Sequence, residues 1–335
     1  MKGYKIDHIC SCGGFGSQFC CLLTWLYAGN GRLKINFANK CTFKCAWSKL
    51  NTKHNIFEII FEKIEYKNIE YDCLPELIYS NEKNNIKNSV CYNCCWELSK
   101  KQKSLTIRRQ NIFDSINFRN LYVEHNLKGS LVNNIIYDTK NIVRKSLSDT
   151  YYKYLKPKKK IIDKINKYLK FYENNFVVGI HIRSSQHYEK LAQNNVRTKD
   201  IVTSICREIL KMKKKNRINK YSKFFIATSN INILEKVKKM LGFENLIFID
   251  TYRDNNTIYE NNQQDLNKND WTKETNNIKK YGVLNYTIDI FIDIFLLSKC
   301  NLLIGGESNI TSSALILNPN LNFLVPSILK NTNHK

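Results

Sequence analysis

Apolar and polar residues alternate in the second half of the chain in blocks whose lengths predict strands and helices in turn. Short apolar runs of buried-strand length are followed by longer segments with apolar residues at helical spacing. We expect strands at FVVGIHI, KFFIAT, NLIFID and NLLIGG, beginning at residues 176, 223, 245 and 301. Helices are expected over 198–215, 230–242, 285–299 and 309–317. This alternation predicts a parallel sheet covered by helices on both faces.

The first half has fewer recognisable elements. A strand is expected at YKIDHIC, followed by the glycine turn CGGFGSQ and a helix at FCCLLTWLYA. Near residue 155, Pro157 and a lysine run precede an amphipathic helix with Ile161, Ile165, Leu169 and Tyr172 at helical spacing. This break predicts two domains, residues 1–155 and 156–335, which agrees with the usual division of a chain of 335 residues.

Polar residues gather directly after three of the predicted strands. Because the carboxyl ends of parallel strands meet at one edge of a sheet, where open α/β folds bind ligands, we expect these residues to lie near one another. They are His181 and Arg183 after the first strand, Thr228, Ser229 and Asn230 after the second, and Gly305, Gly306, Glu307 and Ser308 after the fourth.

The last of these loops has the chemistry of a phosphate site. Two glycines precede Ser308 and Asn309, which open a helix, so unpaired N–H groups and the helix dipole favour an anion there. Arg183 offers a planar guanidinium for a second face of the phosphate. The alternative is an ordinary strand-to-helix turn with Ser308 as its N-cap.

Composition limits the range of partners. The formal charge is +24, from 53 Lys and Arg against 29 Asp and Glu, which by itself favours a polyanionic partner. The basic residues are scattered, however, and the Lys-, Asn- and Ile-rich composition is typical of an AT-rich genome. Signatures of nucleic-acid-binding modules are missing, so we do not expect a nucleic acid as partner.

No apolar run is long enough for a membrane span, and the amino terminus has no signal-peptide pattern, which predicts a soluble cytoplasmic protein. The 12 cysteines are then expected to be reduced. Two groups, Cys41 with Cys45 and Cys91 with Cys94 and Cys95, leave a structural zinc site open as an alternative to buried or free thiols.

Three dispersed motifs resemble those of the fucosyltransferase superfamily, which includes α1,2-, α1,6- and protein O-fucosyltransferases and the nodulation enzyme. VVGIHIR is similar to the first motif, a strand ending in His-x-Arg, and FFIATSN to the second. DIFLLSKCNLLIGGESNITSSALIL is similar to the third, which joins an acidic residue, Leu-Ser, a strand and a phosphate loop. GGFGSQ is similar to the turn that opens many α1,2-type members.

The resemblance implies a GT-B fold, in which two Rossmann-like domains face a central cleft and the carboxyl-terminal one holds GDP-fucose. It implies an inverting transfer of L-fucose to a hydroxyl of a glycan or protein, without a metal or other cofactor. Two alternatives stay open: a GT-B transferase that uses another nucleotide sugar, and a non-catalytic basic protein that binds nucleic acid or another polyanion.

The resemblance also assigns roles to residues. Arg183 corresponds to the arginine that stabilises the departing phosphate, His181 to a nucleotide contact, and Asp293 to the residue that reads guanine. The remaining substrate contacts would be Gly13, Gly14, Gly16, Thr228, Ser229, Asn230, Gly305, Gly306, Ser308 and Asn309. The structural alternatives are a satisfied core histidine for His181 and a solvated helix face for Asp293.

The sequence departs from the family pattern at two places. After His-x-Arg the chain reads SSQHYE and lacks the usual aspartate, so the general base is expected to be Glu189 or His187, unless Arg183 alone supports a dissociative path. The acidic pair expected after Ala227 and Thr228 is replaced by Ser229 and Asn230, which weakens that part of the nucleotide assignment.

Overall fold

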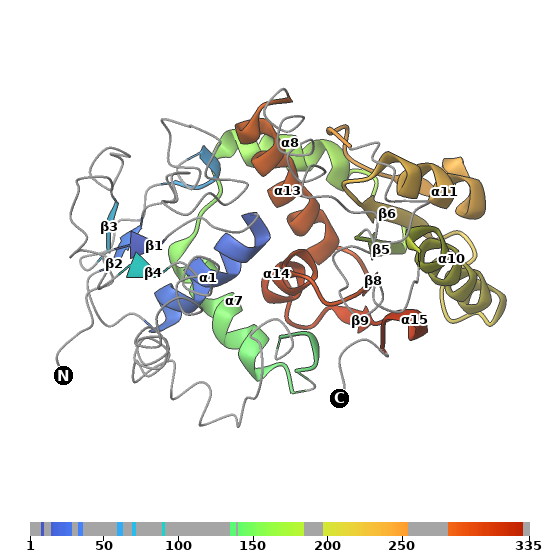
Figure 1. The fold of residues 1–335 in the computed structure, drawn as a ribbon, viewed down its shortest axis with the longest axis horizontal. Coiled ribbons are helices and arrows are strands. Elements are labelled where there is room, and N and C mark those ends of the chain that lie inside the picture. The colour runs from blue at the N-terminus through green and yellow to red at the C-terminus, as the bar shows by residue number, and fades with distance from the viewer. Residues whose placement is uncertain are drawn as a thin grey trace. The chain divides into compact units, whose positions relative to one another are not determined.

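The computed structural model of the 335-residue chain divides into two compact units, Met1–Ile162 and Asp163–Lys335 (Figure 1). It describes residues 8–9, 15–28, 33–35, 59–62, 69–71, 89–90, 135–138, 140–183, 197–253 and 281–330. The division falls inside a helix, a few residues beyond the boundary expected from the sequence near residue 155.

The second unit is built on a five-stranded sheet in which every neighbouring pair is parallel. The strand order is β7-β6-β5-β8-β9. The strands are β5 (Val177–His181), β6 (Lys223–Ala227), β7 (Leu246–Ile247), β8 (Leu302–Gly305) and β9 (Asn322–Leu324). Side chains of the central strand β5 are buried along its whole length, as expected for a strand covered on both faces.

Helices cover the two faces of this sheet in pairs (Figure 1). The two helices α10 and α11 pack together on one face, and α13 and α14 pack together on the other. Their bounds are α10 (Thr198–Lys214), α11 (Ile231–Leu241), α13 (Val283–Ser298) and α14 (Asn309–Leu317). The chain moves outward from β5 to β6 and β7 and then returns to the other side of β5 with β8. With right-handed crossovers, the usual hand for parallel strands, this order places the two pairs of helices on opposite faces.

The chain therefore adds strands in one direction from β5 and in the opposite direction from β8, so the strand order reverses between these two neighbours. His181 is paired in register with Gly305, so the two chain segments that leave these strands begin side by side at the carboxyl edge of the sheet. A reversal of this kind opens a crevice at the carboxyl ends, because the loops after the two strands lead to helices on opposite faces. The topology thus places the polar loops predicted from the sequence at a favoured ligand position.

At Gly179 in β5, the space between the sheet and the end of α13 is too small for a side chain. A Cβ there would lie 2.8 Å from Sγ of Cys300 and 3.0 Å from Cδ2 of Leu297. We expect Gly179→Ala to lower the free energy of unfolding by about 1–3 kcal/mol, because a packed core cannot absorb the added methyl group. The shift in the urea denaturation midpoint measures this loss.

A second variant identifies the contact responsible. Because Cys300 Sγ is the nearest obstacle, combining Gly179→Ala with Cys300→Ala should cost less than the sum of the two single substitutions. Strictly additive losses would contradict the packing explanation.

The described part of the first unit centres on α1 (Phe15–Ala28) and α7 (Ile142–Tyr154), which pack together. Their shared core is aromatic: the ring of Phe19 lies 6.1 Å from that of Phe61 and 5.8 Å from that of Tyr151. Two parallel strand pairs, β1 (His8–Ile9) with β4 (Ser89–Val90) and β2 (Leu33–Ile35) with β3 (Ile69–Tyr71), belong to the same unit.

The sequence anticipated the elements of the second unit closely. All four expected strands and four expected helices are present, although NLIFID forms a strand only at Leu246–Ile247. The amphipathic helix is α8 (Lys159–Leu169), which ends before Tyr172. Elements of this unit not expected from the sequence are η5 (Phe243–Asn245), β9 and α15 (Ser327–Lys330). In the first unit, β2, β3, β4 and α7 were not expected. Among the described residues, no helix combines the length and the apolar character needed to cross a membrane.

Candidate functional site at the carboxyl edge

The loop after β8 is a tight strand-to-helix connection. Ser308 caps α14 with its side chain, because its Oγ accepts a hydrogen bond from the backbone N–H of Thr311 at 3.0 Å. Gly305 leaves little room for a side chain, since a Cβ there would lie 3.2 Å from Oγ1 of Thr311 and 3.3 Å from the carbonyl oxygen of His181. The loop is therefore held close to the end of β5, with the amino terminus of α14 at the same edge.

His181 connects the two loops at the reversal point. Its Nδ1 lies 3.0 Å from Oγ1 of Thr311 and 3.1 Å from Oγ of Ser308, and the Ser308 hydroxyl donates to Thr311 over 3.1 Å. These three side chains are buried. The histidine predicted to contact nucleotide thus braces the candidate phosphate loop in this structure.

Burial keeps the His181 imidazole neutral. Loss of hydration, reinforced by the positive charge of Arg183, lowers the pKa of His181 from 6.5 to about 3. His181 therefore supplies no positive charge to this edge at neutral pH.

Arg183 follows two residues after the end of β5 and is half-buried. The neighbouring Ile182 is buried, and its backbone N–H still donates to the carbonyl of Ala227 over 3.2 Å, so the chain leaves the sheet only at Arg183. This position puts a guanidinium at the point where the strand order reverses. It is a cation whose charge does not depend on pH in the physiological range.

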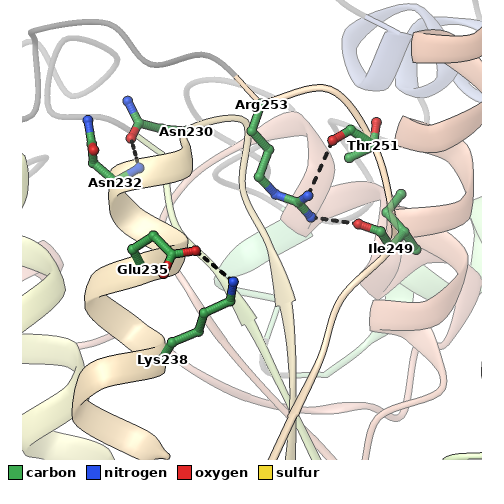
Figure 2. A network of polar contacts seen from close by, with 7 residues as sticks. All are labelled: Asn230, Asn232, Glu235, Lys238, Ile249, Thr251 and Arg253. Atoms are coloured by element: carbon green, nitrogen blue, oxygen red, sulfur yellow. Dashed lines mark hydrogen bonds and ion pairs between the residues drawn. The ribbon is translucent and has the colours of Figure 1, made fainter. Parts of the chain in front are cut away.

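The loop after β6 uses its polar side chains to start α11 (Figure 2). Oδ1 of Asn230 accepts from the backbone N–H groups of Asn232 and Ile233, at 2.9 and 3.2 Å. Oγ1 of Thr228 accepts from the backbone N–H of Asn230 at 3.3 Å, whereas Ser229 is exposed. Of the three residues predicted here, two are thus engaged in capping and Ser229 faces solvent.

A second polar group joins α13 to the segment that follows β7. We call it the Asp293 cluster, and its members are Thr251, Arg253, Tyr281, Asp289 and Asp293. Oδ2 of Asp289 accepts hydrogen bonds from the hydroxyl of Thr251 at 2.7 Å and from that of Tyr281 at 2.8 Å. Neither aspartate lies on a solvated helix face, because both are buried.

Asp293 is the less satisfied of the two carboxyl groups. Its Oδ1 is buried and has no hydrogen-bond partner among the described residues. Burial raises the pKa of Asp293 from 3.8 to about 8; the positive charge of Arg253 opposes that rise, and the nearby Asp289 adds to it. An unsatisfied buried acceptor of this kind marks a candidate ligand contact.

Arg253 supplies the cluster with a fixed cation. Its guanidinium donates to the backbone carbonyls of Ile249 at 2.9 Å and Thr251 at 3.4 Å (Figure 2), and its Cζ lies 5.5 Å from the centre of the Phe248 ring. Its Nε is buried without a hydrogen-bond acceptor in the part of the chain that is described. Burial lowers the pKa of Arg253, while the neighbouring carboxylates act against that shift.

Of the remaining residues predicted for the site, some lie outside the described part of the chain and the others have defined positions. Both candidate bases, His187 and Glu189, lie outside the described residues, as do Gly13, Gly14 and the cysteine groups considered for zinc. Gly16 is described and lies inside α1, not in the turn before it. Asn309 is the first residue of α14 and Gly306 is buried in the preceding loop.

Thr251, Arg253 and Tyr281 were not anticipated from the sequence. Arg253 stands in the polar stretch after NLIFID, so the rule that located His181 and Arg183, polar residues following a strand, also applies to it. Tyr281 has no comparable signal, because its contact with Asp289 depends on where the chain enters α13.

Comparison with solved structures finds the same fold. The structure of NodZ α-1,6-fucosyltransferase soaked with GDP-fucose is similar to this chain with a TM-score of 0.52, at 14% identity over 94% of each chain. Fucosyltransferase NodZ from Bradyrhizobium also gives 0.52, at 15% identity over 94% of each chain. The complex of POFUT1 with GDP-fucose gives 0.46, at 11% identity over 97% of this chain and 99% of that chain.

No protein-family model matches the sequence, and no curated protein matches it. The similarity therefore lies in the fold, where it agrees with the motifs recognised in the sequence. In its α/β architecture, with a parallel sheet flanked by helices, the chain resembles the fucosyltransferases of the GT-B class.

Proposed function

We propose that the chain is a glycosyltransferase that moves L-fucose from GDP-fucose to a hydroxyl of a glycan or protein, with inversion at the anomeric carbon. The observation that carries this proposal is the reversal of strand order between β5 and β8, which puts Arg183, the Ser308 loop and the start of α14 at one edge. Fold similarity to a fucosyltransferase whose crystals were soaked with GDP-fucose supports the choice of donor.

The positive charge at this edge would stabilise a departing nucleoside diphosphate. As the glycosidic bond breaks, the bonding electrons pass to the β-phosphate oxygen, whose negative charge grows toward the transition state. A fixed guanidinium at Arg183 and the N–H groups of the α14 amino terminus would stabilise that charge more than they stabilise the bound donor. In this proposal no metal is required, because these groups already supply the positive potential.

The roles of the other groups follow from their surroundings. His181 would hold the Ser308 loop in place as a neutral ring, through its contacts with Ser308 and Thr311. Asp293 would accept from N1–H and the exocyclic amine of guanine once it is ionised. His187 or Glu189 would remove the proton of the acceptor hydroxyl, which is the role expected for them from the sequence.

Nucleotide binding tests the proposal without knowledge of the acceptor. We expect GDP to raise the melting temperature of the purified chain, because a ligand at about 100 times its Kd stabilises the folded state by about 2.7 kcal/mol. UDP, ADP and CMP at the same concentration should give clearly smaller shifts. If GDP and GDP-fucose both leave the melting curve unmoved, the proposal is wrong, and an equal response to UDP would favour another nucleotide sugar.

A further inference from the structure

The edge of the sheet opposite the candidate site carries an unusual surface. Because all five strands are parallel, the segments that precede them meet at one amino edge. Four of these segments are residues 170–176 before β5, 211–222 before β6, 238–245 before β7 and 299–301 before β8.

Exposed aromatic rings concentrate there. The described residues of the second unit include five exposed large hydrophobic side chains, and four of them are aromatic residues of these segments. Tyr221 is 71% exposed, Phe243 63% and Phe171 56%, and Phe176 is also exposed. The fifth, Leu210, lies in the last turns of α10, which run toward the same edge. A single exposed ring needs no explanation, but the confinement of four exposed rings to one edge of the sheet does.

The same edge is strongly basic. Residues 211–223 read KMKKKNRINKYSK, with seven basic residues and no acidic one. Four more lysines lie on the neighbouring segments, against the two acidic residues Glu173 and Glu244. One of these lysines, Lys238, is paired with Glu235 of α11 at 2.6 Å. The complete basic set is Lys170, Lys211, Lys213, Lys214, Lys215, Arg217, Lys220, Lys223, Lys238, Lys239 and Lys299.

Direct contacts join these segments into one surface. The backbone N–H of Lys223 donates to the carbonyl of Phe176 at 3.0 Å, and its Nζ donates to the carbonyl of Glu244 at 3.1 Å. Cations also sit over the rings: Nζ of Lys220 lies 4.8 Å from the ring centre of Tyr221, and Nζ of Lys238 lies 5.4 Å from that of Phe243. We call this surface the basic-aromatic edge.

We propose that the basic-aromatic edge docks on the surface of an anionic lipid bilayer. Aromatic rings that project from turns can enter the boundary between headgroups and acyl chains, while lysines around them stay at the level of the negative headgroups. Ten of the eleven cations are lysines, the compact charges suited to a lipid surface, and only Arg217 offers the planar fork favoured for nucleic acids. A second copy of the chain would present like charge and be repelled.

This inference goes beyond the proposed function and does not depend on it. The basic-aromatic edge and the carboxyl edge lie at opposite ends of the same strands. An orientation with the amino edge on the bilayer would therefore leave Arg183 and the Ser308 loop directed away from it. The donor nucleotide would then reach its site from solution.

Vesicle binding tests the proposal with the full chain. We expect the protein to float with vesicles of equal parts phosphatidylcholine and phosphatidylglycerol, but not with vesicles of phosphatidylcholine alone. Added salt should weaken the binding, because the attraction is between exposed charges.

Two sets of variants separate charge from ring insertion. Changing Lys211, Lys214 and Lys215 to glutamine should lower the vesicle partition coefficient roughly 100-fold, since each lysine contributes about 1 kcal/mol near an anionic surface. Changing Phe171 and Tyr221 to serine should lower it at least about tenfold, because the rings no longer enter the interface. All five side chains are exposed, so the melting temperature should stay near that of the wild type.

Matched controls and a competing ligand make the outcome decisive. Changing Lys156, Lys160 and Lys164 to glutamine removes the same charge from exposed positions elsewhere and should leave vesicle binding within about threefold. The proposal is overturned if both lysine triples weaken binding equally, or if the serine variant binds as the wild type does. It is also overturned if the chain ignores anionic vesicles but binds a single-stranded oligonucleotide through the same lysines.

Discussion

Replacing Arg183 with alanine is expected to reduce the rate of GDP release from GDP-fucose by about 10²–10³-fold, the usual cost of removing one preorganised group that stabilises transition-state charge. The loss in rate should exceed the loss in GDP affinity, because the charge on the leaving phosphate is larger in the transition state than in the bound donor. Water serves as acceptor in this assay, so the natural acceptor is not needed.

Two further variants make the Arg183 result specific. Arg183→Lys should recover only part of the rate, because an ammonium keeps the charge but loses the planar fork that matches two phosphate oxygens. Arg217→Ala removes the same charge from the exposed amino edge and should leave the rate close to that of the wild type. A wild-type rate in Arg183→Ala would remove this residue from the proposed mechanism.

Asp293→Asn is expected to weaken GDP binding by about 10–100-fold and to remove the preference for GDP over UDP, because a carboxylate that accepts from two N–H groups of guanine is replaced by an amide. The effect should also depend on pH. The pKa of Asp293 is raised to about 8 in the free protein, so below that pH guanine binding must expel a proton. GDP affinity of the wild type should therefore increase by up to about tenfold per pH unit up to about pH 8, and that of the asparagine variant should not.

The melting temperatures of the wild type and of Asp293→Asn should also differ, and the difference should grow as the pH rises. Burial raises the folded-state pKa of Asp293 above its unfolded value, so its contribution to stability is present below about pH 4 and is lost as the pH rises through about 8. Asp293→Asn should consequently have a higher melting temperature than the wild type at pH 9, and the advantage should shrink toward pH 5. Calorimetry at several pH values gives both the Kd and the melting temperature.

Either part of this prediction can fail separately. GDP binding that is independent of pH in the wild type and unaffected in Asp293→Asn would contradict the guanine assignment. An unchanged pH dependence of the melting temperature would contradict the raised pKa, whatever the nucleotide result.

The local pattern of apolar and polar residues was sufficient to predict the architecture of the second unit. The buried runs around Val178, Phe225 and Leu303 and the helical spacing between them encode strand and helix, because each depends on residues close in sequence. The same pattern located the carboxyl ends and so selected Arg183 and Ser308. By contrast, β7 is shorter than NLIFID suggested, because only Leu246 and Ile247 pair with β6, at Phe224 and Phe225.

The order of the elements and the edge at which polar residues collect thus follow from local patterns in the sequence. What those residues do depends on the folded structure, because burial and long-range contacts are set by the packing of distant segments. His181 became a neutral brace through contacts with Ser308 and Thr311, more than 120 positions away in the chain. Asp293 of α13 is buried and interacts electrostatically with Arg253, a residue that belongs to no motif recognised in the sequence.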